Sequence, residues 1–255
     1  MRWYLLLSLL LVNLTAYSEQ SLEALIACDT FSDLRFSTRK DFIHLRSALR
    51  EISSHTGLRL KMNILTGSSL TSNNVESWVE NIEKAPADVV LFYYSGHGCQ
   101  PQNMTTPWPC LMFPKKIEFF SSDALCARLK AIHSRLVIII LDCCNTTEST
   151  TPPGLQVFAP KVARAKTSLP GLKTLFLKTQ GLVITAGSSP GEAAYALGNG
   201  SLFTNALIQA LHTGTASTAV SWEGIFNHAS EICSTRQHPI SSLHIAPVPV
   251  RGKGL

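Results

Sequence analysis

Two short, continuously apolar runs constrain the fold of this chain more than any other feature. They cover residues 89–94 and 136–141, they are rich in β-branched and aromatic side chains, and Gly or polar residues follow each of them. This pattern predicts two strands that are buried on both faces. Further apolar stripes make strands and helices alternate along the chain, which favours an α/β domain with a mostly parallel sheet covered by helices on both sides.

Reactive side chains stand just past the ends of these two runs. His97 follows the first run, and Cys143 and Cys144 follow the second run after Asp142. Because the carboxyl ends of parallel strands open into one crevice, we expect His97 and Cys144 to meet there. An imidazole raises the ionised fraction of a nearby thiol and later protonates a leaving amine. The N–H groups of Gly98 and Cys144 are the expected donors to an oxyanion.

The remaining periodicity predicts the other elements. Two strands cover residues 22–28 and 58–64, and Asp41 opens the first helix, for which Gly57 is the expected C-terminal stop. Thr38 and Asp41 resemble the two ends of a capping box, so the presence of Asp41 could be explained by stabilisation of the helix N-terminus alone. Stripes of helical spacing predict three helices, over residues 42–52, 75–82 and 125–132.

Four segments together resemble the caspase–metacaspase family of clan CD cysteine peptidases. They are Tyr-Ser-Gly-His-Gly at 94–98, Asp-Cys-Cys at 142–144, the segment 184–194, and Gly-Ser-Leu-Phe-Thr at 200–204. The resemblance covers most of the chain and is closest to bacterial caspase-like and metacaspase-type domains. It implies a three-layer α/β/α sandwich with a mostly parallel central sheet, and a cysteine endopeptidase that needs no cofactor.

The resemblance also bears on which cysteine is the nucleophile. In metacaspase-like relatives the strand ends in Asp-x-Cys and the reactive cysteine is the second residue after the Asp, which is Cys144 here. The alternation of a strand turns Cys143 toward the other face, where a small buried packing residue is the expected role. Cys143 stays the alternative nucleophile.

Three residues match the family's pocket for the substrate residue before the cut. They are Asp41, Ser95 and Asp142, and in metacaspase-like relatives this pocket prefers Arg or Lys. The resemblance therefore implies protein or peptide substrates with basic residues. Animal caspases instead bind an Asp through arginines. Arg39 lies near enough to Asp41 to keep cleavage after Asp as an alternative.

The chain departs from the family after the cysteines. Asn-Thr-Thr-Glu at 145–148 replaces the usual continuation, which permits a catalytically inactive interaction domain as another alternative. A metal site built from His97, Cys99, Cys143 and Cys144 does not match the usual zinc spacings. No metal ligand is predicted, and the several Asp of calcium-dependent metacaspases have no clear counterpart.

The predicted organisation is one domain behind a leader. Residues 1–18 have the charged start, short apolar stretch and small-residue end of a signal peptide, so the chain is expected to be exported, either secreted or, in a bacterium, periplasmic. The domain 19–255 divides into a large-subunit-like part at 19–149, a connector at 150–172 and a small-subunit-like part at 173–255. Basic residues in the connector make self-cleavage there an expectation. The three candidates are Lys161, Arg164 and Lys166.

Composition argues against some partners and bears on the oxidation state of the cysteines. The net charge of +5 is mild and the basic residues are scattered, so nucleic acid is not an expected partner. Beyond the leader, no segment is long and apolar enough to predict a membrane span. Seven cysteines in an exported chain suggest pairs plus a free thiol, with Cys99 and Cys110 as one possible pair, and activity that requires reducing conditions is a hypothesis.

Overall fold

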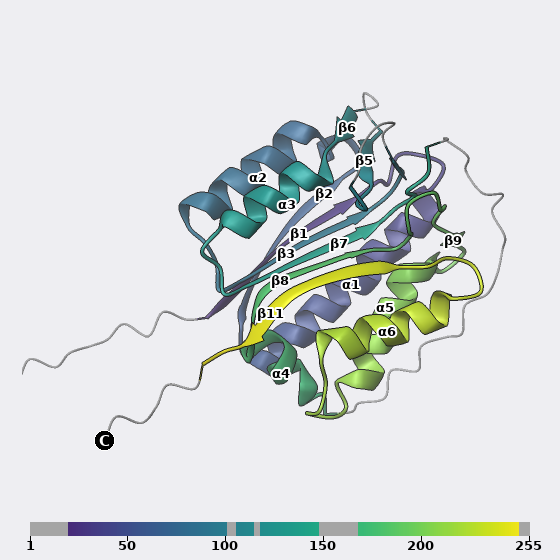
Figure 1. The fold of residues 1–255 in the computed structure, drawn as a ribbon. Coiled ribbons are helices and arrows are strands. Elements are labelled where there is room, and N and C mark those ends of the chain that lie inside the picture. The colour runs from purple at the N-terminus through teal and green to yellow at the C-terminus, as the bar shows by residue number, and fades with distance from the viewer. Residues whose placement is uncertain (1–19, 101–105, 115–117, 148–167, 250–255) are drawn as a thin grey trace, which may run out of the picture.

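A computed structural model describes residues 20–100, 106–114, 118–147 and 168–249. A six-stranded sheet forms its centre, in the order β11-β8-β7-β3-β1-β2 (Figure 1). All neighbouring strands run parallel except β11, which pairs antiparallel with β8. The strands are β1 Ser21–Cys28, β2 Arg59–Thr66, β3 Val89–Ser95, β7 Leu136–Asp142, β8 Thr179–Ala186 and β11 Ile240–Pro247.

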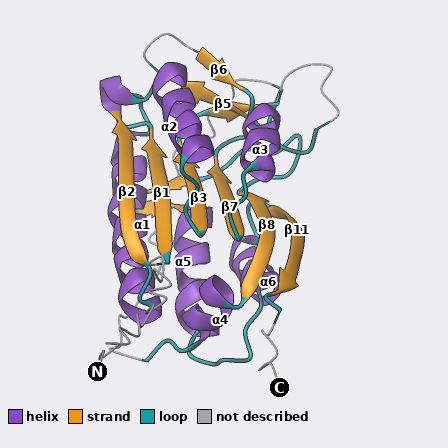
Figure 2. Ribbon diagram, turned by 90° about the vertical axis from the view of Figure 1, so that its left-hand side faces the viewer, coloured by secondary structure: helices purple, strands orange, loops and turns teal. Residues whose placement is uncertain are grey.

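Helices cover both faces of this sheet, which confirms the predicted three-layer α/β/α sandwich. One face carries α2 Ser72–Lys84 and α3 Ser122–Ala131, and the other carries four helices (Figures 1 and 2). These four are α1 Arg35–Thr56, α4 Gly171–Leu177, α5 Leu202–Gly214 and α6 Trp222–Cys233.

The two central strands are buried at every position, as their apolar runs predict. Their side chains alternate between two cores. Leu91 and Tyr93 pack into the core on the α1, α4, α5 and α6 side, while Phe92 and Tyr94 pack into the core beneath α2 and α3. A strand with an apolar layer on each side has no solvent face, which is why these runs are continuously apolar.

Short strands stand beyond the carboxyl ends of the parallel strands, and the apolar pattern did not predict them. β4 Gly98–Cys99, β5 Cys110–Phe113 and β6 Glu118–Phe120 form a small antiparallel sheet, whose β5 and β6 lie past the arrowheads of the main sheet in Figure 2. β9 Ala196–Leu197 pairs with β10 Gly200–Ser201 just before α5. These pieces are too short for a period of two to show in the sequence.

The predicted start of the first helix was wrong. α1 begins at Arg35, so Asp41 lies in its second turn and no capping box forms there. Thr38 instead donates its hydroxyl to the carbonyl oxygen of Asp29 at 2.6 Å, which ties the incoming loop to the helix. The C-terminal stop is confirmed, because Gly57 adopts the left-handed conformation with φ of 79°.

Parts of the predicted organisation lie outside the described residues. They include the leader at 1–18 and the part of the connector that holds Lys161, Arg164 and Lys166. The last residues of the predicted connector are described, and α4 already begins at Gly171. Within the described ranges, none of the helices combines the length and the apolar character that a membrane span needs.

Candidate active site

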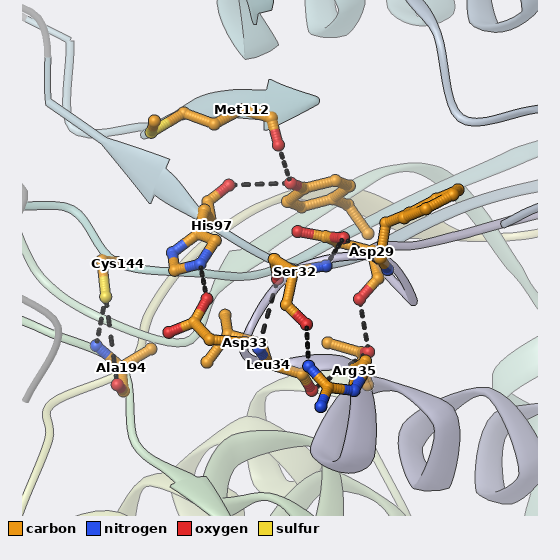
Figure 3. Close-up of polar contacts among 12 residues, drawn as sticks. Asp29, Ser32, Asp33, Leu34, Arg35, His97, Met112, Cys144 and Ala194 are labelled. Atoms are coloured by element: carbon orange, nitrogen blue, oxygen red, sulfur yellow. Dashed lines mark hydrogen bonds and ion pairs between the residues drawn. The ribbon is translucent and has the colours of Figure 1, made fainter. Parts of the chain in front are cut away.

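His97 and Cys144 stand at the same rim of the sheet because the strands before them pair in register. β3 and β7 run parallel with Ser95 opposite Asp142. His97 lies two residues past Ser95, and Cys144 lies two residues past Asp142. The equal offset places the imidazole and the thiol at the same rim of the sheet, and Figure 3 shows both side chains there.

The turn that carries His97 is fixed by partly buried hydrogen bonds. The hydroxyl of Tyr94 lies 2.7 Å from the carbonyl oxygens of both His97 and Met112. The N–H of Met112 donates to the carbonyl of His97 at 3.0 Å. In the alternation of an antiparallel ladder, this bond makes Gly98 and Leu111 a non-hydrogen-bonded pair, so the Gly98 N–H points away from the strand pairing.

Gly98 is the point where the histidine turn touches the cysteine turn. A Cβ at this position would lie 2.5 Å from Cys143 Sγ and 2.7 Å from the carbonyl oxygen of Cys144. No side chain fits at these distances, so only glycine lets the two turns approach this closely.

The thiol of Cys144 is partly exposed and held by the segment after β8. The N–H of Ala194 donates to Cys144 Sγ at 3.3 Å, and the Ala194 carbonyl oxygen lies 3.9 Å from the same sulfur. Burial raises the pKa of the Cys144 thiol, and the Ala194 N–H opposes that rise. Among the described residues, no hydrogen bond links this sulfur to the ring of His97. The imidazole instead contacts Asp33, whose Oδ1 lies 2.7 Å from His97 Nε2.

Cys143 faces the opposite side of the sheet, as the alternation predicts. It is 1% exposed and packs in the core beneath α2 and α3. Burial raises its pKa well above the ordinary value. A thiol that is buried and hard to ionise suits packing and not nucleophilic attack, so the geometry favours Cys144.

The three predicted pocket residues lie close together. Asp41 is fully buried and accepts hydrogen bonds from Ser95 Oγ at 2.7 Å and from the N–H of Ser201 at 2.7 Å, as well as from the Ser201 hydroxyl. Asp142 is buried and accepts from the N–H of Thr204 at 3.0 Å and from the Thr204 hydroxyl. Asp142 therefore also accepts an N–H from the first turn of α5, and Asp41 accepts the N–H of Ser201, the residue just before that helix.

Burial raises the pKa of both carboxyls, and the hydrogen bonds offset part of the rise. The pKa of Asp41 reaches about 6. The pKa of Asp142 reaches about 7, because the nearby charge of Asp41 adds to the effect of burial. No ion pair joins either carboxylate to a cation in the described part of the chain. Arg39, the residue that kept cleavage after Asp open, lies exposed on α1.

The turn after Cys144 is locked by Asn145, at the point where the chain departs from the family pattern. Asn145 is fully buried, its side-chain amide donates to the Pro107 carbonyl at 2.9 Å, and its N–H donates to the Glu192 carbonyl at 2.9 Å. Its carbonyl accepts from the N–H of Gly191 at 2.7 Å. These bonds join the cysteine turn to the same segment that holds the thiol.

An apolar hollow of about 480 Å³ lies beside His97. Its walls come from the turn after β1 and from the end of β5, and Phe31, which is 62% exposed, forms part of them. The residues around it are Asp29, Phe31, Ser32, His97, Met112, Phe113 and Pro114. Sequence reasoning missed this hollow and also missed Asp33, Ala194 and the role of Asn145, because no spacing signal links them to His97 or Cys144.

Metal binding finds no support in the described residues. They contain no group of three or more His, Cys, Asp or Glu side chains placed to hold an ion. The alternative site from His97, Cys99, Cys143 and Cys144 is therefore not assembled, since Cys143 turns to the other face of the sheet.

Comparison with known proteins gives one family and several similar folds. The family model described as the caspase domain of peptidase family C14 matches residues 23–247. The structure of caspase-1 from Spodoptera frugiperda is similar at 13% identity and a TM-score of 0.58, over 88% of this chain and 86% of that one. Protein GSU0716 from Geobacter sulfurreducens is similar at 14% identity and a TM-score of 0.57, over 90% of this chain and 95% of that one. No curated protein sequence matches the chain.

Proposed function

The chain belongs to the caspase-domain family of cysteine peptidases, and from this premise we propose that it is an active endopeptidase in which Cys144 is the nucleophile and His97 the proton-transfer group. The observation that carries the proposal is the equal offset of the two side chains past the paired ends of β3 and β7. Both stand at one rim of the sheet, where an extended substrate can reach them.

The reaction divides into acylation and deacylation. Cys144 Sγ attacks the scissile carbonyl carbon, and its proton passes through His97 to the leaving amine as the C–N bond breaks. The N–H groups of Gly98 and Cys144 stabilise the oxyanion, for which each donor typically contributes ~10²–10³ in rate. A water molecule, deprotonated by His97, then attacks the thioester, which releases the carboxylic acid and restores the thiol.

Asp41 and Asp142 support a preference for Arg or Lys before the cut. The charge of Asp41 raises the pKa of the neighbouring buried Asp142, and a guanidinium or ammonium group would relieve that repulsion. Both also accept hydrogen bonds at α5, so a structural role accompanies the proposed one. Arg39 lies exposed, which gives no support to an Asp-binding pocket.

The resting contact of Cys144 supports a second candidate, a caspase-like domain that binds partners without cleaving them. The thiol contacts Ala194 and has no hydrogen bond to His97 within the described residues. Activity therefore requires the sulfur to turn toward the imidazole when substrate binds. Enzymatic assay separates the two candidates.

Export and self-processing complete the proposal. The leader pattern at 1–18 supports secretion or periplasmic export, and a pocket for basic residues would accept the connector residues Lys161, Arg164 and Lys166. Mapping the new N-termini of incubated protein tests the self-cleavage. A chain that stays intact while it cleaves peptides contradicts it.

A peptide library profiled with wild type and Cys144→Ala tests the central proposal. Turnover should vanish in the variant and persist in Cys126→Ala, a matched control in which a buried thiol is removed from α3. Cleavage by wild type that survives in Cys144→Ala would reassign the nucleophile. Absence of cleavage by wild type would favour the non-catalytic candidate.

A further inference from the structure

A carboxylate from the turn between β1 and α1 reaches the imidazole of the site. Asp33 Oδ1 lies 2.7 Å from His97 Nε2, although the two residues are 64 positions apart in the chain (Figure 3). The second ring nitrogen lies on the side of the imidazole nearer to Cys144 in the same view. The ring therefore has one nitrogen bound to a carboxylate and the other turned toward the thiol.

The turn that presents Asp33 is held by its own hydrogen bonds. Asp29 is fully buried, and its Oδ1 accepts from the N–H groups of Phe31 at 3.0 Å and Ser32 at 3.1 Å. Ser32 Oγ then accepts from the N–H of Leu34 at 3.2 Å. These side-chain bonds fix the backbone on both sides of Asp33. The carboxylate that meets His97 is thus carried by an ordered turn.

We propose that Asp33 is a positioning residue for His97, an inference that rests on the proposed peptidase function. A carboxylate at Nε2 keeps the proton on that nitrogen, so that Nδ1 carries the lone pair that accepts the proton of the Cys144 thiol. The same carboxylate stabilises the imidazolium formed in that step. A serine-peptidase triad uses an aspartate for the same purpose at the opposite ring nitrogen.

Asp33 is the charged group that contacts the His97 ring in the described residues. In the described part of the chain, titratable groups around this turn include Cys144, the buried Asp29 and Tyr94, whose hydroxyl contacts the His97 carbonyl oxygen, and Arg35 follows on α1. Arg35 donates to the Ser32 carbonyl at 3.4 Å, and its guanidinium stacks over Phe36. The hydrogen bond from His97 lowers the pKa of the Asp33 carboxyl, so Asp33 is ionised at neutral pH.

Exposure sets the expected size of the effect. The side chains of Asp33 and His97 are 61% and 28% exposed, so solvent screens their attraction and orientation is the larger contribution. A buried triad aspartate contributes ~10⁴ in kcat. For this exposed pair we expect about a tenfold loss of kcat when the carboxylate is removed.

The test compares Asp33→Asn, Asp33→Ala and Asp33→Glu with the control Glu80→Gln, which removes an exposed charge from α2. Steady-state assays on a peptide cleaved by wild type should show kcat lowered about tenfold in the first two variants, with KM unchanged and the acidic limb of the kcat profile moved to lower pH. Asp33→Glu should recover part of the rate, and Glu80→Gln should match wild type.

A second readout does not depend on peptide cleavage. The rate at which iodoacetamide alkylates Cys144, followed by mass spectrometry at pH 7, reports the thiolate that His97 supports. It should fall in Asp33→Asn toward the rate of His97→Ala. If wild type cleaves no peptide but this fall is seen, the proposed function fails while the role of Asp33 stands. Unchanged kcat profile and unchanged alkylation in both Asp33→Asn and Asp33→Ala would overturn that role.

Discussion

Asp41 on α1 and Asp142 at the end of β7 are 101 positions apart in the chain, yet they accept hydrogen bonds from the backbone of Ser201 and Thr204 at the same end of α5. A helix N-terminus has unpaired N–H groups and a partial positive charge, which suits negative groups. Two carboxylates meet there without a cation in the described residues. Their shared position links the stability of the domain to its proposed specificity.

The first prediction concerns specificity. Asp142→Asn should raise KM for peptides with Arg before the cut by about tenfold or more, because one of the two carboxylates proposed to bind the guanidinium is lost. Peptides with a neutral residue there should be affected less. Initial-rate assays on matched Arg and Leu peptides measure the ratio. Asp123→Asn on α3 is the control, and an equal loss on both peptides would contradict the pocket.

The second prediction concerns stability and pH. The folded-state pKa values of about 6 for Asp41 and about 7 for Asp142 lie above the ordinary pKa of an Asp side chain. At pH values between the ordinary pKa and the folded-state pKa, the folded state therefore binds more protons than the unfolded state. The stability from these groups is fully present below pH ~4 and is lost as pH rises through about 6 and 7. Urea unfolding from pH 4 to 8 should show a smaller decline in Asp142→Asn than in wild type. Equal slopes in the two proteins would contradict it.

The third prediction concerns Gly98. Gly98→Ala places a Cβ against Cys143 Sγ and the Cys144 carbonyl, so it should cost about 1–3 kcal/mol of stability and displace the proposed oxyanion donor. Chemical denaturation and kcat measure the two effects. Gly198→Ala is the matched control, because its Cβ meets no atom within 4 Å. Equal stability and equal kcat in the two variants would show that the close approach of the two turns at Gly98 has no consequence.

The fourth prediction concerns redox state. Cys99 and Cys110 are directly opposite each other in the β4–β5 ladder, and both are free thiols in this structure. Opposed residues in such a ladder lie at a separation that a disulfide can span. Oxidised glutathione should therefore join them and raise stability by about 2–3 kcal/mol for a loop of this size.

Peptide mapping without reductant identifies the bond, and thermal unfolding of wild type and Cys99→Ser measures its effect. Such a pair leaves Cys144 free, so activity should persist after oxidation. Loss of activity that dithiothreitol restores would show instead that Cys144 itself is oxidised.

The sequence predicted the centre of the sheet well because buried strands carry a strong local signal, whereas it gave no prediction of the edge strand β11. The continuous apolar character of β3 and β7 follows from burial on both faces, and the same topology explains why His97 and Cys144 share a rim. The start of α1 was missed because its first turn, from Arg35, has few apolar residues and no side-chain cap at Leu34.

The contacts around the site could not be predicted from the sequence, for a different reason. Asp33 contacts His97, and Ala194 contacts Cys144, through turns whose shape depends on Asp29 and Asn145. No periodicity encodes such long-range contacts between loops. Their identification required the chain to be folded in three dimensions.

The parallel pairing of β7 with β8 has a consequence for the proposed cleavage of the connector. The connector runs between these two strands, and they remain hydrogen-bonded neighbours inside one core. A cut in the connector would therefore yield two polypeptides that stay together without a covalent link. Once separated in denaturant, they could reunite only by a bimolecular encounter, so recovery of the nicked protein would depend on its concentration while recovery of the intact chain would not.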